Sequence, residues 1–597
     1  MSLPKSYMPP ANEMSIQGYS RTWPRTDEAA SPLRGRHLAT AEDVSVAVDG
    51  NPSISREGPA DADVAASVAE AYRRYGRDAL GRISGNFAVA IVDHRKDAVL
   101  LAIDRMGIEQ MSFCASGGGL AFDSSLRGLA RRVGTTKLRA QSLFDYLLLH
   151  VVPAPATAFE GLEKLRPGTY VWFEKGRVNV DRYWRPEFFE GRADFAELKA
   201  ELRGRLEGAV RACAPDDATG AFLSGGLDSS SVAGMLSKVR RAPSSFSIAF
   251  GVESYNEIEY ARIASRHFGL KSYEYDVTPS DIVAAIPQLA AAFDEPFGNS
   301  SAVPTLFCAR LAAENGVRHL LAGDGGDEIF GGNERYVRQK VFERYFLLPR
   351  FLRAGLIEPA ARRIAANSAV MPLRKLRSYI DQASIPLPER LETWNYAYRA
   401  DLRSMLEPDF LAAIDARAPL REMTETYAAS GPCSLLNRML HYDWYYTLAY
   451  NDLRKVGTAC DLAGVRVSYP MLDTAMIDLS LRVPTAMKIE GSELRSFYKR
   501  AMADFLPSEI LTKPKHGFGL PFGQWLKTHG PLAELVYGHL TNLKRRGIVR
   551  SQFIDDLVAS HKTGHASFFG YPIWDLVMLE AWLDRHATPY GTTQRMS

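Results

Sequence analysis

The sequence has few cysteines, and their arrangement suggests neither disulfides nor a metal cluster. No C-x-x-C pair occurs, and no histidine lies at metal-ligand spacing from a cysteine. The five cysteines are Cys114, Cys213, Cys308, Cys433 and Cys460. This scatter excludes a disulfide scaffold and favours buried free thiols in a reducing compartment.

Long hydrophobic runs and a strong charge imbalance are also missing. No segment reaches the roughly 18 apolar residues that span a bilayer, and the N-terminal residues lack a signal-peptide core. The chain has 72 basic and 69 acidic residues, for a formal net charge of +3 over 597 residues. We therefore expect a cytoplasmic enzyme of two to four domains, with no nucleic-acid partner and no membrane partner.

The first third of the chain is typical of β structure. A helical pattern over residues 62–75 precedes several short apolar segments with turn residues between them. The strand candidates are residues 86–92, 98–103, 117–122 and 168–173. This pattern predicts a β-rich domain, and we place its end at residue 190, before a helical pattern over 195–213.

The second part of the chain, residues 191–597, alternates strands with helices. Strand candidates are residues 220–223, 245–250, 272–276 and 317–322, and the first three are each followed by a helical segment. Residues 333–451 are mostly helical in pattern. The alternation predicts an α/β fold with a doubly wound parallel sheet and a helical elaboration.

The clearest motif is AFLSGGLDSS at residues 221–230. Gly225 and Gly226 let backbone N–H groups approach a diphosphate closely, and the helix that follows adds a positive field. Hydroxyl donors come from Ser224, Ser229 and Ser230, whereas Asp228 would act through a bridging Mg²⁺. No lysine follows the glycines, so the loop differs from the G-x-x-x-x-G-K-[ST] motif.

An acidic, glycine-rich segment, AGDGGDEIFGGN, follows a strand candidate at residues 322–333. Ligands of open α/β sheets bind at the carboxyl ends of the strands, where such a loop lies. We expect Asp327 to be the second carboxylate ligand of Mg²⁺, which usually takes one or two carboxylates plus phosphates.

A third motif, LTKPKHGFGL, occupies residues 511–520. Its two lysines flank a proline, which would hold at least one ammonium in a stiff loop. Alone, this segment would be a solvated surface turn. Beside a nucleotide, a pre-positioned cation would stabilise the charge that builds on the α-phosphate.

In this order and spacing, the three motifs resemble the asparagine synthetase B family, whose ATP-pyrophosphatase members cleave ATP between the α and β phosphates. Residues 85–107 are similar to the family's glutamine-hydrolysing domain, which is a class II, Ntn-type amidotransferase. Residues 245–250, 255–269, 293–312 and 467–484 are similar to its synthetase domain. The resemblance therefore covers most of the chain and implies an amidotransferase-like domain over 1–190 and a synthetase domain over 191–597.

The resemblance also implies roles for individual residues. Leu223 and Ile248 would contact adenosine through their backbones, and Ala322 and Gly323 would lie beside the α-phosphate. Lys515 would be the lysine that stabilises the transition state, with Asp228 and Asp327 holding Mg²⁺. The cofactors implied are ATP and Mg²⁺.

Two departures from the family concern the source of nitrogen. Glutamine-using members carry a cysteine directly after the initiator Met, whereas this sequence has Ser2, a weaker nucleophile, and its first cysteine is Cys114. The family's Asn-Gly-Glu turn that holds glutamine is replaced by Asp49-Gly50-Asn51. We expect the N-terminal domain to be degenerate, without glutaminase activity.

A third departure concerns the acceptor site. Asparagine synthetases have Glu between the glycines of the acidic loop and β-lactam-forming relatives have Tyr, but this chain has Asp324. We expect Asp324 to act as a base or to position the substrate, and we count it with Lys515 as a catalytic candidate.

Without glutamine as a donor, the amine must be free ammonia or part of the substrate. The pattern favours a lasso-peptide cyclase, which adenylates an Asp or Glu side chain of a precursor peptide and closes a macrolactam with its N-terminal amine. Its partners would be the precursor peptide, a leader peptidase and a leader-binding protein. An ammonia-dependent asparagine synthetase, a β-lactam-type cyclase and a non-catalytic peptide-binding relative remain alternatives.

Overall fold

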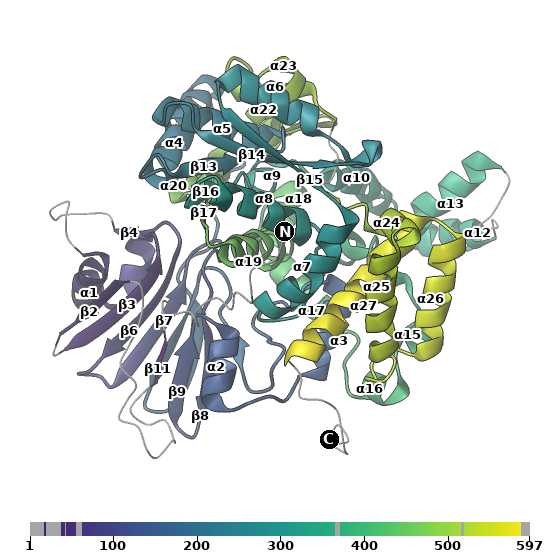
Figure 1. The fold of residues 1–597 in the computed structure, drawn as a ribbon, viewed down its shortest axis with the longest axis horizontal. Helices are drawn as coiled ribbons and strands as arrows, with labels where there is room; N and C mark the ends of the chain where they lie inside the picture. Colours follow the sequence, from purple (N-terminus) through teal and green to yellow (C-terminus); the bar gives the residue numbers. More distant parts are fainter. Residues whose placement is uncertain are drawn as a thin grey trace.

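A computed structural model describes residues 17–19, 37–41, 43–54, 63–363, 370–514 and 519–586. The N-terminal part contains two antiparallel sheets that face one another (Figure 1). The six-stranded sheet has the order β12 (Arg177–Arg182), β11 (Thr169–Glu174), β7 (Ala98–Ile103), β6 (Phe87–Asp93), β3 (Val44–Gly50) and β2 (His37–Thr40). The four-stranded sheet has the order β1 (Gln17–Tyr19), β9 (Gly119–Asp123), β8 (Ser112–Ser116) and β10 (Glu163–Lys164).

Alternation along the strands builds two cores, one on each face of the six-stranded sheet. Val46 and Val48 of β3 pack with helix α1 (Val64–Tyr75) on the outer face. Ala47 and Ala90 point the other way and pack with Phe122 of the second sheet. The small side chains on the inner face let the two sheets approach closely, as in other layered β structures.

The C-terminal part is built on a parallel five-stranded sheet. Its order is β15 (Lys271–Val277), β14 (Ser244–Phe250), β13 (Thr219–Phe222), β16 (His319–Leu321) and β17 (Arg466–Ser468). Every neighbouring pair is parallel. The chain moves to one side from β13 to β14 and β15 and to the other side for β16, so the switch point lies between β13 and β16. The predicted doubly wound sheet is confirmed, and β17 is a strand that the sequence pattern did not predict.

Helices cover both faces of this sheet (Figure 1). One face carries α4 (Phe195–Cys213), α5 (Leu227–Val239) and α6 (Ile258–Phe268). The other carries α8 (Ala302–Glu314) and α19 (Leu453–Ala463), with α7 (Pro279–Ala292) packed on α8. Both layers bury the sheet, so residues of the central strands β13 and β16 are buried on both faces.

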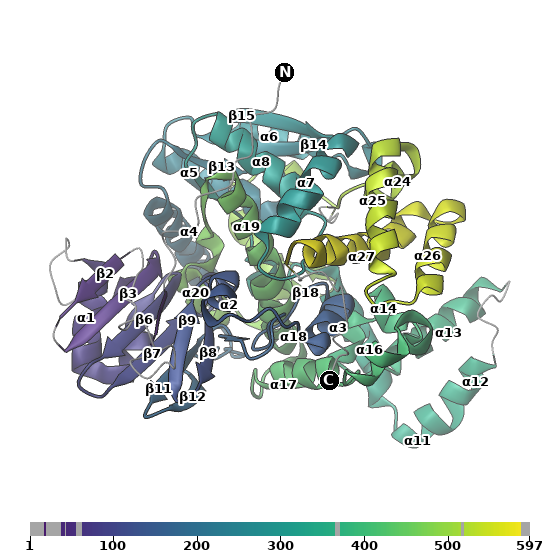
Figure 2. The same ribbon diagram turned by 60° about the horizontal axis from the view of Figure 1, so that its bottom comes forward.

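The elaboration predicted after residue 333 is helical. It includes α10 (Glu334–Glu343), α12 (Glu358–Arg362), α13 (Met371–Ala383), α17 (Ala418–Ala428) and α18 (Leu435–Asp443). The described part of the chain ends in α24 (Phe522–Thr528), α25 (Gly530–Leu543), α26 (Ser551–Thr563) and α27 (Ala566–His586). Figure 2 shows α12 and α13 projecting to one side, while α27 runs back beside α7.

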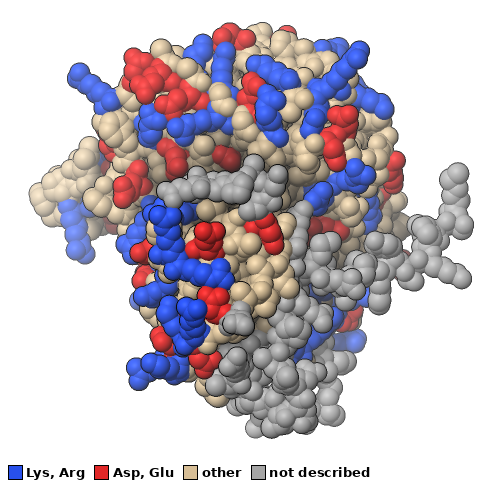
Figure 3. Space-filling model, turned by 90° about the vertical axis from the view of Figure 1, so that its left-hand side faces the viewer, with Lys and Arg blue, Asp and Glu red and all other residues tan. Residues whose placement is uncertain are grey.

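The two parts of the chain share one continuous apolar core, which joins residues of α3 (Ala140–Leu149) to the helices around the parallel sheet. Polar contacts reinforce the junction: the Tyr146 hydroxyl donates to the carbonyl of Asp575 at 2.8 Å, and Arg127 pairs with Asp294 at 2.6 Å. The division at residue 190 stays a prediction, since α4 begins a few residues later at Phe195. On the face shown in Figure 3, basic and acidic side chains are intermingled, as the near balance of charge leads one to expect.

Candidate active site

A large cavity lies at the carboxyl ends of the parallel strands, across the switch point. It has a volume of about 770 Å³ and is lined by the loops after β13, β14 and β16, together with residues of α8, α19 and the segment 492–514. Open α/β sheets bind their ligands at this place, and the volume is that of a small-molecule site. The first two sequence motifs therefore meet in one cavity.

The loop after β13 is arranged to receive an anion. Helix α5 begins at Leu227, and its N-cap, Gly226, provides no side-chain hydrogen bond to the first turn. Ser224 and Ser229 lie on either side of the turn, with their hydroxyl oxygens 3.0 Å apart. Amide groups and hydroxyls at a helix N-terminus form a site for phosphate oxygens.

Two glycines fix how closely the loops pack. Gly225 has φ +69°, and a Cβ there would lie 2.4 Å from the backbone nitrogen of Ala261 in α6. A Cβ on Gly323 would lie 2.6 Å from the backbone nitrogen of Ser229. No other residue type fits either position without moving the backbone, so these glycines hold the two loops against α5 and α6.

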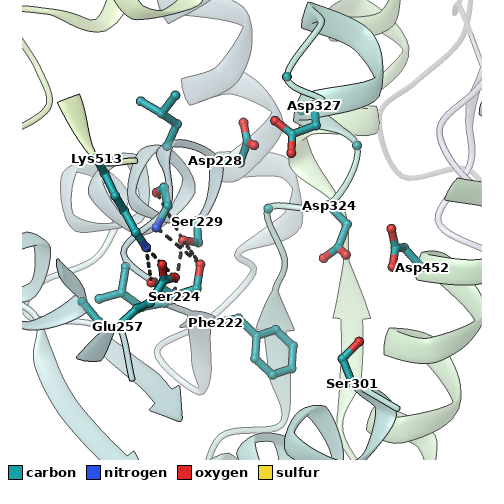
Figure 4. Close-up of a pocket in the computed structure, with 18 of the residues that line it drawn as sticks. Phe222, Ser224, Asp228, Ser229, Glu257, Ser301, Asp324, Asp327, Asp452 and Lys513 are labelled. Carbon is teal, nitrogen blue, oxygen red and sulfur yellow. Dashed lines mark hydrogen bonds and ion pairs between the residues drawn. The ribbon is translucent and has the colours of Figure 1, made fainter. Parts of the chain in front are cut away.

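Asp228 and Asp327 lie side by side in the cavity (Figure 4). Both accept hydrogen bonds from Arg495, a residue that the sequence reasoning missed. The Nη1 atom of Arg495 lies 2.5 Å from Asp228 and 3.1 Å from Asp327, and its Nη2 also donates to Asp228. Arg495 directly precedes α22 (Ser496–Met502), and it belongs to none of the three sequence motifs.

The pair Asp228 and Asp327 fits a divalent cation. Both carboxylates converge on a buried positive charge, and a Cβ on Gly326 would lie 2.0 Å from Asp228 Oδ1, so the glycine makes room for that carboxylate. Over the described residues, no group of three or more His, Cys, Asp or Glu side chains forms a metal site. Two carboxylates plus phosphate oxygens are what Mg²⁺ usually takes.

A second acidic group faces the other end of the cavity. Asp324 and Asp452 approach one another there (Figure 4), and Lys455 Nζ lies 2.7 Å from Asp452 Oδ1. Burial raises the pKa of Asp324 to about 6, with Asp452 adding to the rise and Lys455 opposing it. Asp452 and Lys455 were not predicted, because they lie at and just after the start of α19, far from Asp324 in the sequence.

The third motif is only partly described. Lys513 pairs with Glu257 at 2.9 Å and lies 3.4 Å from the carbonyl oxygen of Ser224 (Figure 4). Its ammonium also stands over the ring of Tyr260. These contacts attach the motif to the loop after β13. Lys515 lies outside the described residues, so its role stays a prediction.

The remaining predicted nucleotide residues fall into two groups. Leu223 and Ile248 line the cavity, in a region that also includes Phe246, Phe250 and Tyr255. Gly225, Ser230 and Ala322 are not among its lining residues; Ser230 and Ala322 are completely buried. Their positions behind the cavity wall suit residues that support the loops. The direct ATP contacts assigned to these three residues remain predictions.

One side chain connects the cavity to the N-terminal part. Arg454, between Asp452 and Lys455 in the sequence, donates to the carbonyl of Gly107 at 2.7 Å and to that of Ile108. The buried Asp104 lies nearby, as does Glu109, whose pKa is raised to about 7 by burial and by Asp104. The helix that carries Asp452 is thus attached to the β-rich part.

Comparison with known families agrees with this geometry. The family model for asparagine synthase matches residues 201–584, and that for the glutamine amidotransferase domain matches residues 57–184. The chain belongs to the asparagine synthase family. This asparagine synthase family member is therefore an ATP-dependent amide-forming ligase with an N-terminal domain of the glutamine amidotransferase type. No described helix is long and apolar enough to cross a membrane.

Similar proteins carry related names. A provisionally named glutamine-hydrolysing asparagine synthetase of Mycobacterium tuberculosis is 27% identical over 534 residues, covering 86% of this chain and 79% of that protein. Asparagine synthetase 1 of Bacillus subtilis, also named as glutamine-hydrolysing, is 23% identical with the same coverage. The glutamine phosphoribosylpyrophosphate amidotransferase of B. subtilis aligns structurally over 49% of this chain and 64% of its own, with 10% identity and a TM-score of 0.18.

Proposed function

We propose that this asparagine synthase family member is a lasso-type peptide cyclase. It would adenylate an Asp or Glu side chain of a precursor peptide and close a macrolactam with the peptide's N-terminal amine. The observation that carries the proposal is the charge of the cavity. Its described lining includes eight carboxylates but four cations: Lys455, Arg495, Lys499 and Lys513.

Each of these four cations already has an acidic partner within the cavity. Lys455 pairs with Asp452, Lys499 with Glu493 and Lys513 with Glu257, while Arg495 holds Asp228 and Asp327. Free aspartate would bring two carboxylates with its one ammonium, a net negative charge, and would need an additional cation for the carboxylate that does not react. A peptide brings one reacting carboxylate and an ammonium, which suits an acidic lining better.

The nucleotide half of the cavity supports adenylation. The backbone N–H groups and serines after β13 would hold the β,γ-diphosphate, and the region around Ile248 would take the adenine. The peptide carboxylate then attacks the α-phosphorus and pyrophosphate leaves. When bound, Mg²⁺ would neutralise phosphate charge, with Asp228 and Asp327 as its protein ligands.

The acidic group at the other end of the cavity would receive the amine. An ammonium near Asp324 and Asp452 is attracted by both carboxylates, and ionised Asp324 would take its proton. The neutral amine then attacks the acyl carbon and AMP departs. Holding both ends of one peptide in the cavity makes this step unimolecular, which is the main source of rate.

We propose that the N-terminal domain supports the synthetase rather than hydrolysing glutamine. The turn 49–51, which differs from the family's glutamine-holding turn, is held by a hydrogen bond from Asn51 N to the carbonyl of Asn86 at 2.9 Å. A precursor peptide with a free N-terminal amine would come from a leader peptidase and a leader-binding protein, which we propose as partners.

An ammonia- or glutamine-dependent asparagine synthetase is the second candidate. The names of the relatives in M. tuberculosis and B. subtilis favour it. An asparagine synthetase would have to bind aspartate in a cavity whose described lining has more carboxylates than cationic side chains.

A substrate comparison separates the two candidates. The protein is incubated with Mg²⁺ and ATP plus a linear peptide that has a free N-terminal amine and an internal Asp or Glu, aspartate with ammonium, or aspartate with glutamine. A cyclase releases AMP and pyrophosphate with the peptide, whose mass falls by one water. Asparagine formation would instead identify the second candidate, and ADP with orthophosphate would contradict both.

One variant and its matched control test the role of Lys515 in that assay. Lys515→Ala should lower AMP release by roughly 10²–10³-fold, the usual effect of removing one group that stabilises a transition state. Lys527→Ala is a matched control, because Lys527 lies on α24 and donates to the carbonyl of Gly564, outside the cavity lining. A Lys515→Ala protein as active as this control would remove Lys515 from the mechanism.

A further inference from the structure

Arg495 occupies the place between the two carboxylates that the proposed function assigns to Mg²⁺. Its guanidinium is almost fully buried, with 4% of the side chain exposed, and it pairs with both Asp228 and Asp327. Burial lowers the pKa of Arg495, but the two carboxylates raise it by more than burial lowers it. The net shift of the pKa is upward, so the guanidinium stays charged. The protein therefore supplies its own cation at this position.

The geometry of Arg495 indicates a side chain whose hydrogen bonding is incomplete. Its Nε atom is buried and has no hydrogen-bond partner among the described residues. Its backbone adopts the left-handed conformation, with φ 59° and ψ 31°, which is uncommon for a residue with a side chain. Buried donors are nearly always satisfied, so a missing partner suggests that one arrives in another state.

Charge explains why a metal ion alone would not displace this arginine. Two carboxylates and one guanidinium together carry one negative charge. Adding a divalent cation would leave one uncompensated positive charge beside the nearly buried guanidinium, which is unfavourable. A triphosphate reverses this balance, because its oxygens provide negative charge for both the metal and the displaced guanidinium.

We infer that Arg495 is an internal counter-ion that reserves the metal position, so that the divalent cation enters only together with the nucleotide. This inference rests on the assignment of Asp228 and Asp327 to Mg²⁺ in the proposed function. Its consequence is that the two carboxylates stay neutralised and correctly placed in the nucleotide-free protein. Metal and nucleotide binding are then coupled by the protein rather than independent.

The test uses Mn²⁺ as the probe in place of Mg²⁺, followed by electron paramagnetic resonance without nucleotide or peptide. Arg495→Asn removes the charge while suiting the left-handed backbone, which asparagine tolerates. We expect wild type to bind no Mn²⁺ at this site without nucleotide, and the variant to bind it at least about tenfold more tightly. With α,β-methylene ATP present, wild type should bind Mn²⁺ as well.

A thermal melt gives an independent readout. Arg495→Asn leaves two adjacent carboxylates without their counter-ion, so its melting temperature should fall and should recover when Mg²⁺ is added. Arg500→Asn is the matched control, since Arg500 is an exposed residue of α22, the helix that follows Arg495, and pairs with Glu490 at 3.5 Å. The melting temperatures of this control and of wild type should not respond to Mg²⁺ alone.

Each outcome is decisive. Mn²⁺ binding to nucleotide-free wild type with the affinity of Arg495→Asn would overturn the inference while leaving adenylation intact. Absence of Mn²⁺ from every variant, even with nucleotide, would overturn the metal assignment in the proposed function as well. If Arg495→Asn does not fold, Arg495→Lys replaces it. Lysine cannot make the bidentate contact with Asp228, so Mn²⁺ binding should still become tighter. Unchanged Mn²⁺ binding would refute the inference.

Discussion

At the scale of single residues, catalysis depends on the ionisation of Asp324. Burial raises the pKa of this carboxyl to about 6, so it is ionised at neutral pH and protonated in mild acid. If Asp324 takes the proton of the amine, the rate should fall about tenfold per pH unit below pH 6. The measurement is a pH profile of cyclisation under single-turnover conditions.

The Asp324→Asn variant provides the comparison for that profile. It should cyclise about 10²-fold more slowly, and the fall in rate near pH 6 should disappear. A variant that retained the wild-type profile would assign the titration to another group.

A second carboxyl, Glu109, affects stability rather than chemistry. Its pKa is raised from 4.5 to about 7, so the folded state binds a proton more tightly than the unfolded chain does. The stability from this group is complete below about pH 4.5 and is lost as the pH rises through 7. Because Glu109 is partly exposed, we expect an effect of about 1–3 kcal/mol.

The Glu109→Gln substitution measures this effect. The variant keeps a neutral side chain that can bond with Asn86, which donates to Glu109 at 2.7 Å in the wild type. Urea unfolding should show the variant gaining stability over wild type between about pH 5 and pH 8. A constant difference across that range would contradict the raised pKa.

At the scale of elements, the N-terminus of α5 trades helix stability for anion binding. Its N-cap is Gly226, which gives no side-chain hydrogen bond to the first turn. Among the described residues, a Cβ at this position would meet Ser224 Oγ at 3.4 Å and Ser229 Oγ at 4.0 Å, so a larger residue fits between them. The glycine is therefore explained by the ligand rather than by the fold.

The Gly226→Asp substitution tests this trade. Aspartate is a good N-cap and complements the helix dipole, so the free energy of unfolding should rise by about 0.5–1 kcal/mol. The same carboxylate would repel a triphosphate, and ATP binding measured by calorimetry should be lost. A variant that bound ATP normally would show that the diphosphate lies elsewhere.

At the scale of the whole molecule, the shared core makes the two domains one cooperative unit. Residues of α3 and the segment around Val151 and Phe159 lie in the same apolar core as the helices of the synthetase domain. Buried pairs, such as Lys164 with Glu295, cross the same junction. Large apolar junctions couple the unfolding of the parts that they join.

Deleting residues 1–184 should therefore be severe even if the N-terminal domain performs no chemistry. The deletion exposes apolar surface and leaves buried carboxylates such as Glu295 without a partner, so we expect aggregation rather than a soluble synthetase. Calorimetry of the full chain should show one transition. A soluble fragment, or two separate transitions, would show that the domains are independent.

Local patterns predicted several of the strands and helices that build the two larger sheets. The strands β6, β7, β13 and β14 and the helix α4 lie at or within a residue or two of the positions that apolar patterning indicated. Patterning failed for β3 and β17: β3 lies in a stretch rich in turn residues, and β17 is a three-residue strand. β17 pairs with the distant β16, and β3 pairs with the distant β6 as well as with its neighbour β2, so sheet pairing contributes to both strands beyond local propensity.

The sequence by itself determined the class of chemistry, because the loop after β13 and the acidic segment 322–333 act through backbone turns and neighbouring side chains that are local in the chain. Only the tertiary structure decided which distant side chains complete the cavity. Asp452, Lys455 and Arg495 carry no local signal, since their roles depend on charged groups that are far apart in the chain and that folding brings to one cavity. Electrostatic interaction depends on separation in space, which a linear pattern does not record.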